Sequence, residues 1–156
     1  MKKRWIILIA IVLLALDQLT KFLISNNLQL YQEIPIIKNF FSLLYIRNTG
    51  AAFSIFEGKI WLFYLASLIG LIVVVYLFKT SKNKLIDLAA TFLVAGILGN
   101  LIDRLIYQYV IDFLSFTFFG HSFAIFNLAD SFITIAVILY LIDLLINEKK
   151  VKLWKK

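Results

Sequence analysis

The chain has no cysteine and only one histidine, His121, among its 156 residues. Without cysteine it can form no disulfide, no catalytic thiolate and no thiolate-bound metal centre. A single histidine also disfavours histidine-rich zinc sites and serine–histidine triads. We therefore interpret His121 as a structural residue in an aromatic loop, and we expect neither a metal nor a cofactor.

Charged residues are scarce as well. Asp, Glu, Lys and Arg make up 16% of the chain and hydrophobic residues 62%. The mean hydropathy of +0.93 lies far above the range of soluble globular proteins. A helix needs about 20 residues to cross roughly 30 Å of hydrocarbon, so at most about five spans fit. The composition predicts an integral membrane protein without room for a separate soluble domain.

Four apolar runs have the length and composition of membrane-spanning helices. Between the first two runs, residues 34–37 and 40–46 are rich in the aliphatic and aromatic side chains typical of short strands. No repeat or Gly/Ser-rich linker divides the chain, so residues 1–156 are expected to form one membrane domain. We predict an all-α membrane protein, a four-transmembrane-helix bundle with a small extracytoplasmic β-rich region between helices one and two. The predicted spans are residues 5–24, 60–78, 85–106 and 128–146.

The basic residues predict the orientation of this bundle. Eleven of the sixteen Lys and Arg residues precede the first helix, fill the turn between the second and third, or follow the fourth. The positive-inside rule therefore places both termini in the cytoplasm. The net charge of +7 is explained by this topology and by attraction to anionic membrane lipids, and we expect no nucleic acid partner. The first run carries Asp17 and Lys21 and ends without a small-residue cleavage site, so we expect an uncleaved helix.

Two aspartates, Asp112 and Asp130, stand at the rims of predicted apolar helices. A membrane tolerates carboxylates beside its hydrocarbon mainly where they pair, line a polar cavity or carry out chemistry. Taken alone, Asp112 also fits an exposed loop carboxylate, and Asp130 also fits a residue that caps a helix N-terminus. The segment 107–127 carries Asp112 and leads back to the fourth helix, where Asp130 lies. The two aspartates therefore form the candidate catalytic pair.

Further polar residues are expected at the same depth. With a rise of about 1.5 Å per residue, the polar residues of the first helix lie in its outer third. The polar residues of the third helix lie within about one turn of its outer end. Such convergence predicts a polar pocket in the bundle. Stabilising ion pairs, Asp17 with Lys21 and Asp103 with Arg104, are an alternative explanation. The set comprises Asp17, Lys21, Asn48, Asn100, Asp103 and Arg104.

Five short motifs follow one another along the chain. They are Asp17-Gln18-x-Thr20-Lys21, Asn48-x-Gly50-Ala51-Ala52-Phe53, Gly99-Asn100-x-x-Asp103-Arg104, Val110-x-Asp112-Phe113 and Phe126-Asn127-x-Ala129-Asp130. In residue type, order and place on four helices, this set resembles the motifs of the bacterial lipoprotein signal peptidase family, also called signal peptidase II. The similarity covers essentially the whole chain and departs at no essential motif position.

The resemblance implies an aspartic protease of the bacterial cytoplasmic membrane. Such an enzyme removes the signal peptide from diacylglyceryl-modified prolipoproteins on the N-terminal side of the lipidated cysteine. Its catalytic pair would be Asp112 and Asp130, near the extracytoplasmic face. Two carboxylates held close together do not both ionise easily, so one keeps a proton while the other activates a water. This chemistry needs no metal and no covalent acyl-enzyme.

The resemblance also implies supporting residues. Amide donors would bind the substrate backbone or orient the aspartates. Arg104 would pair with Asp103 and shape the site, and Asp17 with Lys21 would brace the first helix. Aromatic residues of the outer loops, with a mobile lid over residues 53–56, would lie at the membrane interface and shield the lipidated peptide. The substrate-binding or dyad-supporting set is Asn48, Gly50, Asn100, Arg104 and Asn127.

Other functional classes remain open from the sequence. A small transporter or a scaffold could hold a polar pocket at the outer rim, although ion pathways usually need polar groups across the whole bilayer. The inner half of the bundle is nearly bare of charged groups. Only Asp87 and Asp143 are expected there, and both lie near the cytoplasmic edge. A serine–lysine peptidase would need a serine such as Ser131 beside a lysine, and Lys21 is the one lysine well placed at that depth.

Overall fold

Four long helices dominate the molecule. The computed structural model describes residues 3–50, 56–81 and 83–154, and within these ranges four helices are long and apolar enough to cross a membrane. Large apolar side chains stay exposed along their outer faces, as expected for surfaces that meet lipid instead of water. The predicted number of spanning helices is confirmed, and the chain is a multi-pass membrane protein. The helices are α1 (Lys3–Asn27), α2 (Ile60–Thr80), α3 (Lys84–Tyr107) and α4 (Leu128–Trp154).

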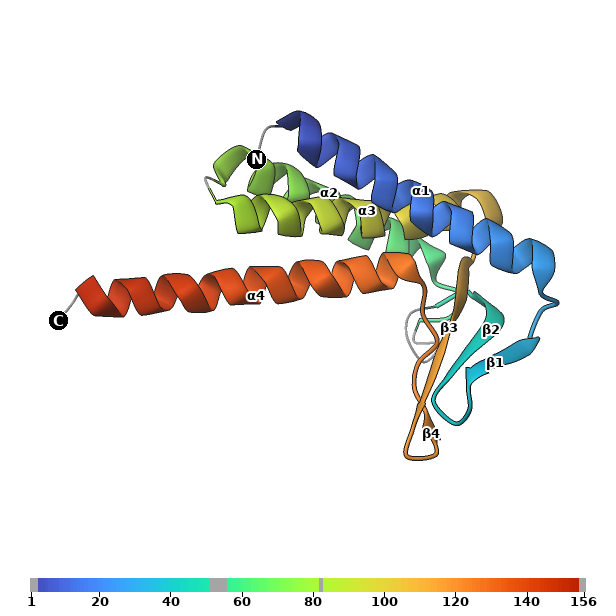
Figure 1. Cartoon of the computed structure of the whole chain (residues 1–156). Helices are drawn as coiled ribbons and strands as arrows, with labels where there is room; N and C mark the ends of the chain where they lie inside the picture. Colours follow the sequence, from blue (N-terminus) through green and yellow to red (C-terminus); the bar gives the residue numbers. More distant parts are fainter. Residues whose placement is uncertain (1–2, 51–55, 82, 155–156) are drawn as a thin grey trace.

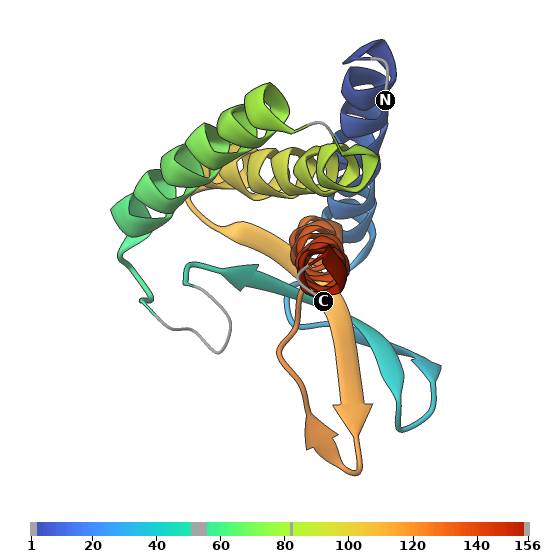
Figure 2. The ribbon, with the colours of Figure 1, turned by 90° about the vertical axis from the view of Figure 1, so that its left-hand side faces the viewer.

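The central helix is α3, which contacts α1, α2 and α4 and lies between α1 and α2 in Figure 2. Half of its most apolar segment is buried inside the protein, compared with 6% for α2. Glycines permit the close approach. A Cβ added at Gly96 would lie 2.5 Å from the Ala129 carbonyl oxygen, and one at Gly99 would collide with the Asp17 carboxylate. This packing of small residues brings polar groups of α1, α3 and α4 together.

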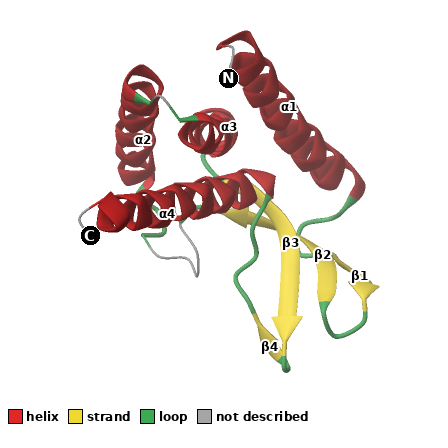
Figure 3. Cartoon of the chain, turned by 60° about the vertical axis from the view of Figure 1, so that its left-hand side comes forward, coloured by secondary structure: helices red, strands yellow, loops and turns green. Residues whose placement is uncertain are grey.

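An antiparallel sheet lies at one end of the bundle, with strand order β1-β2-β3-β4 (Figures 1 and 3). Strands β1 (Glu33–Ile37) and β2 (Phe41–Asn48) belong to the connection between α1 and α2. Strands β3 (Val110–Phe118) and β4 (His121–Ser122) belong to the connection between α3 and α4. The predicted β-rich region between helices one and two accounts for only half of this sheet, because the other two strands come from the second connection.

The missed strand β3 is rich in the β-branched and aromatic residues that favour strands. Its partner is β2, with Ile46 opposite Asp112 and Asn48 opposite Val110. This pairing bridges two intervening helices, so no local pattern in the sequence reveals it. Its consequence for the site is that Asn48 and Asp112 come from adjacent strands.

Packing and alternation fix the direction of the Asp112 side chain. Ile111 and Phe113 belong to a buried cluster with Ile24 of α1 and Tyr45 of β2, which fastens the sheet to the end of α1. Because successive strand residues point to opposite faces, Asp112 points away from that cluster. The expectation that the aromatic residues of the outer loops lie at the membrane interface is wrong for Phe113, which is a core residue with 4% exposure.

Candidate active site

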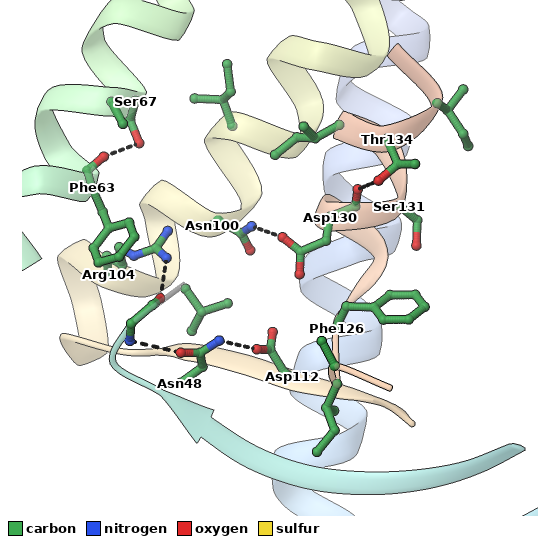
Figure 4. A pocket seen from close by; sticks show the side chains of 18 of the residues that line it. Asn48, Phe63, Ser67, Asn100, Arg104, Asp112, Phe126, Asp130, Ser131 and Thr134 are labelled. Carbon is green, nitrogen blue, oxygen red and sulfur yellow. Dashed lines mark hydrogen bonds between the residues drawn. The ribbon is translucent and has the colours of Figure 1, made fainter. Parts of the chain in front are cut away.

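A cavity of about 800 Å³ opens between the helix ends and the sheet. One part of its wall carries carboxylate, amide and guanidinium groups, shown in Figure 4, whereas most of the rest is apolar. Helices α2, α3 and α4, strands β2 and β3, and the segment before α4 all contribute. Among the predicted site residues, the cavity wall brings together Asn48, Gly50, Asn100, Arg104, Asp112 and Asp130.

Asp112 is almost completely buried, with 1% exposure. The Asn48 side-chain amide donates to its Oδ2 at 2.8 Å, and the Asn127 side-chain amide donates to its Oδ1 at 2.6 Å. These bonds favour the ionised form, but burial and the nearby charge of Asp130 outweigh them and raise the pKa of Asp112 to about 7. The reading of Asp112 as an exposed loop carboxylate is wrong.

Asp130 lies in the first turn of α4 and is held by two asparagines. The Asn100 side-chain amide donates to its Oδ1 at 2.7 Å, and the Asn127 backbone N–H donates to its Oδ2 at 3.2 Å. In return, the Asp130 backbone N–H donates to Asn127 Oδ1 at 3.0 Å. This reciprocal pair resembles a capping box. Asp130 therefore does take part in capping α4, and it faces the cavity as well (Figure 4).

Asn127 connects the two aspartates. It is fully buried, and its side chain contacts Asp112 while its backbone contacts Asp130. Its amide also donates to Asn100 Oδ1 at 3.1 Å and to the Ile111 carbonyl oxygen at 3.3 Å. Asn127 thus holds the first turn of α4, the strand β3 and the helix α3 in a single arrangement.

Behind this pair lies a buried ion triad. Lys21 Nζ is 2.9 Å from Asp17 Oδ2 and 3.1 Å from Asp103 Oδ2, and it donates to Asn100 Oδ1 at 3.1 Å. The two carboxylates also accept backbone N–H groups, Asp17 from Ala129 and Asp103 from Ile111. The triad therefore joins α1 to α3, to the start of α4 and to β3.

The predicted pairing of Asp103 with Arg104 is wrong, because Asp103 pairs with Lys21. Neighbouring residues on a helix point about 100° apart, so they do not face each other. Asp103 points towards α1, and Arg104 points into the cavity, where it donates to the Gly50 carbonyl oxygen at 3.3 Å. The Arg104 guanidinium also lies 4.3 Å from the centre of the Phe63 ring.

Gly50 takes part through its backbone, since its N–H also donates to Asn48 Oδ1 at 2.9 Å. The motif residues that follow, 51–53, and most of the predicted lid over residues 53–56 lie outside the described residues.

Sequence reasoning missed two contributions to the site. The first is Gln18, whose side-chain amide donates to the Gly99 carbonyl oxygen at 3.1 Å and to Asp103 Oδ1 at 3.0 Å. Its place in the first motif was the available signal. The second is the α2 wall of the cavity, where Phe63 and Ser67 lie. No signal distinguished these residues within a uniformly apolar helix.

The geometry favours hydrolysis by carboxylates over the other chemistries. Ser131 Oγ donates to the Asn127 carbonyl oxygen at 3.0 Å, whereas the Lys21 ammonium contacts Asp17, Asp103 and Asn100. The two residues therefore do not form a serine–lysine pair. Within the described ranges no group of three His, Cys, Asp or Glu side chains could hold a metal ion. Two carboxylates at one cavity, one of them with a raised pKa, can together supply a general base and a general acid.

Comparison with known proteins gives a consistent result. The family model described as signal peptidase (SPase) II matches residues 9–146. A "Lipoprotein signal peptidase" of Bacillus pumilus is 41% identical over 93% of this chain and 95% of its own length. Another, of Shouchella clausii, is 44% identical over 92% of this chain and 96% of its own length.

Two solved structures, both described as bacterial membrane enzymes, have the same fold. The first has a TM-score of 0.87 and 39% identity, and the match covers 93% of this chain and 90% of that one. The second has a TM-score of 0.82 and 40% identity, with 90% of this chain and 92% of that one covered.

Proposed function

The chain belongs to the signal peptidase II family, and from this premise we propose that Asp112 and Asp130 are its catalytic pair. The protein is an aspartic protease that removes signal peptides from prolipoproteins. The observation that carries the assignment is the double contact of Asn127, which holds one carboxylate by its side chain and the other by its backbone at the wall of one cavity.

The protonation of the pair assigns the two roles. Burial and the nearby charge of Asp130 raise the pKa of Asp112 to about 7, so we take Asp112 as the general acid and Asp130 as the general base. Asp130 accepts a proton from water as the water oxygen attacks the scissile carbonyl carbon, and Asp112 donates its proton to the carbonyl oxygen. A neutral tetrahedral intermediate results.

Collapse of the intermediate reverses these transfers. Asp130 passes the proton that it accepted to the amide nitrogen, and Asp112 takes back the proton from the hydroxyl group as the C–N bond breaks. The products are a carboxylic acid and an amine, and the dyad again holds one proton. No bond forms between enzyme and substrate in this sequence.

The other polar residues of the cavity position the dyad and the peptide. Asn48 and Asn100 each hold one carboxylate, which restricts the carboxylates to orientations that face the cavity. Arg104, packed on Phe63, places a positive charge in the same wall, where it stabilises the partial negative charge of the scissile carbonyl oxygen while the proton is being transferred. Asn48 and Asn100, which lie in the cavity wall, also bring their amide groups within reach of the substrate backbone once the peptide enters.

We assign the substrate as a prolipoprotein whose cysteine carries a diacylglyceryl group, cut on the N-terminal side of that cysteine. The mixed character of the cavity supports this assignment. Besides the dyad, its wall contains Phe63, Ile97, Ile133 and Ile135, which suit an apolar peptide and lipid chains.

We further propose that residues 1–156 act as one domain in the bacterial cytoplasmic membrane, with both termini in the cytoplasm and the dyad near the extracytoplasmic face. The distribution of basic residues supports this orientation. They cluster at the chain ends and in the turn between α2 and α3, which lie at the opposite end of the helices from the sheet (Figure 1).

The test is cleavage of a diacylglyceryl-modified prolipoprotein by the purified wild type beside Asp112→Asn and Asp130→Asn. Asp143→Asn is the matched control, because Asp143 is also a buried aspartate but binds Asn83 and Asn147 at the other end of α4. We expect both dyad variants to fold and to lose cleavage, and the control to retain it. Near-normal turnover by either folded dyad variant would show that the assignment is wrong, and a folded wild type that cleaves nothing would favour a transporter or a scaffold.

A further inference from the structure

The turn between β3 and β4 contains a residue that its own geometry does not explain. Phe118 pairs with His121, so Phe119 and Gly120 form a two-residue hairpin loop, and both have positive φ, 50° and 79°. Such loops strongly prefer Asn-Gly, Asp-Gly or Gly-Gly. A bulky side chain at positive φ is strained. Phe119 is therefore present for a reason other than turn formation.

Packing within the protein does not explain Phe119 either. Its side chain is completely exposed, with 101% relative exposure, and the neighbouring Phe118 and Phe123 are about half exposed at 48% and 57%. Residues 113–129 include six phenylalanines and not one Asp, Glu, Lys or Arg. An exposed aromatic group without charges marks an interaction surface.

The direction of the hairpin indicates what this surface meets. In Figures 1 and 3 the β3–β4 hairpin runs across the axis of α4 and projects past it. At about 3.3 Å per strand residue, the turn lies roughly 20 Å from Asp112. A helix with its side chains is only about 10 Å wide. Because α4 spans the membrane, the end of the hairpin extends beyond the bundle and over the lipid beside α4.

The aromatic side chains near the turn hold one another in place. Phe40, from the turn between β1 and β2, packs edge to face against Phe118 with ring centres 5.5 Å apart. Phe118 in turn packs against Phe123 at 6.4 Å. We name Phe40, Phe118, Phe119 and Phe123 the hairpin tip. It is a preformed apolar surface, so its burial in an interface costs little additional side-chain entropy.

We propose that the hairpin tip inserts into the outer surface of the lipid bilayer beside α4, at the boundary between headgroups and acyl chains. Phe123 belongs both to the tip and to the cavity wall, so insertion holds the mouth of the cavity at the lipid surface. The insertion itself follows from the fold, whereas its effect on cleavage rests on the proposed function.

The first experiment locates the tip relative to the membrane. Because the chain has no cysteine, Phe119→Cys carries a single nitroxide label, and Gln29→Cys, in the exposed loop after α1, is the control. Both are placed in phosphatidylethanolamine–phosphatidylglycerol vesicles. We expect the label at 119 to collide with oxygen and to be shielded from a water-soluble nickel complex, with the reverse at 29. Equal access of the nickel complex to both labels overturns the proposal.

The second experiment asks what insertion does. In Phe119→Asn the new residue suits the turn, so the hairpin and the thermal stability are expected to persist, while the ratio of inserted to free tip falls up to about tenfold. In vesicles, KM for a lipidated prolipoprotein should rise several-fold at unchanged kcat. An unchanged KM removes the link to cleavage. If the label at position 119 is shielded from the nickel complex but the wild type cleaves nothing, the proposed function is wrong and the proposed insertion still holds.

Discussion

Two carboxylate clusters in this protein are joined through Asn100, and they differ in what surrounds the negative charges. In the triad, Asp17 and Asp103 share the ammonium group of Lys21. In the dyad, the groups within the described chain that donate to Asp112 and Asp130 are amides. The triad is closed off from solvent, whereas the dyad faces a cavity of about 800 Å³.

The difference separates a structural use of aspartate from a chemical one. A carboxylate paired with a buried cation depends on that cation, because removing the cation leaves an uncompensated buried charge. A carboxylate held by neutral amides can exchange a proton without losing its partners. Asn100 connects the clusters, since it accepts from Lys21 and donates to Asp130. The triad thus positions the dyad without entering its proton chemistry.

The largest expected effect comes from breaking the triad. Lys21→Met leaves two buried carboxylates unpaired, and we expect a loss of about 3–5 kcal/mol in the free energy of unfolding. The exposed Lys38 provides the control, Lys38→Met, with an expected change within about 0.5 kcal/mol. Thermal unfolding in detergent micelles measures both. Equal unfolding midpoints for the two variants would mean that the triad does not stabilise the fold.

The next effect comes from removing the residue that touches both dyad members. Because Asn127 donates to both carboxylates and Asn48 to one, Asn127→Ala should lower kcat/KM by about 100-fold and Asn48→Ala by less. Cleavage assays on variants with normal circular dichroism decide the order. A larger loss at Asn48 would contradict the central role of Asn127.

The pH dependence of cleavage sharpens the comparison further. Since the pKa of Asp112 is raised to about 7, the dyad holds its proton below this pH and loses it above. We expect kcat/KM to fall as the pH rises through about 7, approaching about tenfold per pH unit well above it. A profile measured in detergent on the wild type, with folding checked at each pH, provides the test. Activity that still increases towards about pH 9 would exclude Asp112 as the acid.

The smallest effect is expected at Ser131, which lies beside the dyad on α4 but donates only to the Asn127 carbonyl oxygen among the described residues. Ser131→Ala should retain most of the cleavage activity, measured with the same prolipoprotein. Complete loss in a folded variant would revive the serine nucleophile and remove the distinction between the two clusters.

Parts of this arrangement could be predicted because they are encoded locally. Apolar runs of membrane-spanning length predicted the four helices, and the motif around Asn127 and Asp130 placed an asparagine close to one of the two candidate aspartates. Apolarity marks the span but not the end of a helix. The polar and basic residues after Asn147 favour helix too, and α4 continues to Trp154.

Other parts depend on contacts between distant segments. The partner of Asp103 is Lys21 instead of its neighbour Arg104, which follows from the side of α3 that meets α1. Likewise, β3 forms because β2 offers it an edge, although two helices separate them in sequence. Such pairings are set by tertiary packing, and neither residue type nor spacing determines them.

The central claim is that Asp112 shares a proton with Asp130 at neutral pH while the protein is folded and active. Carbon-13 NMR of aspartate-labelled protein in lipid bilayers measures this directly, with Asp112→Asn recorded beside the wild type. The account predicts one side-chain carboxyl resonance that titrates near pH 7 and is absent from the variant. If every resonance that titrates near that pH persists in Asp112→Asn, Asp112 does not carry the catalytic proton.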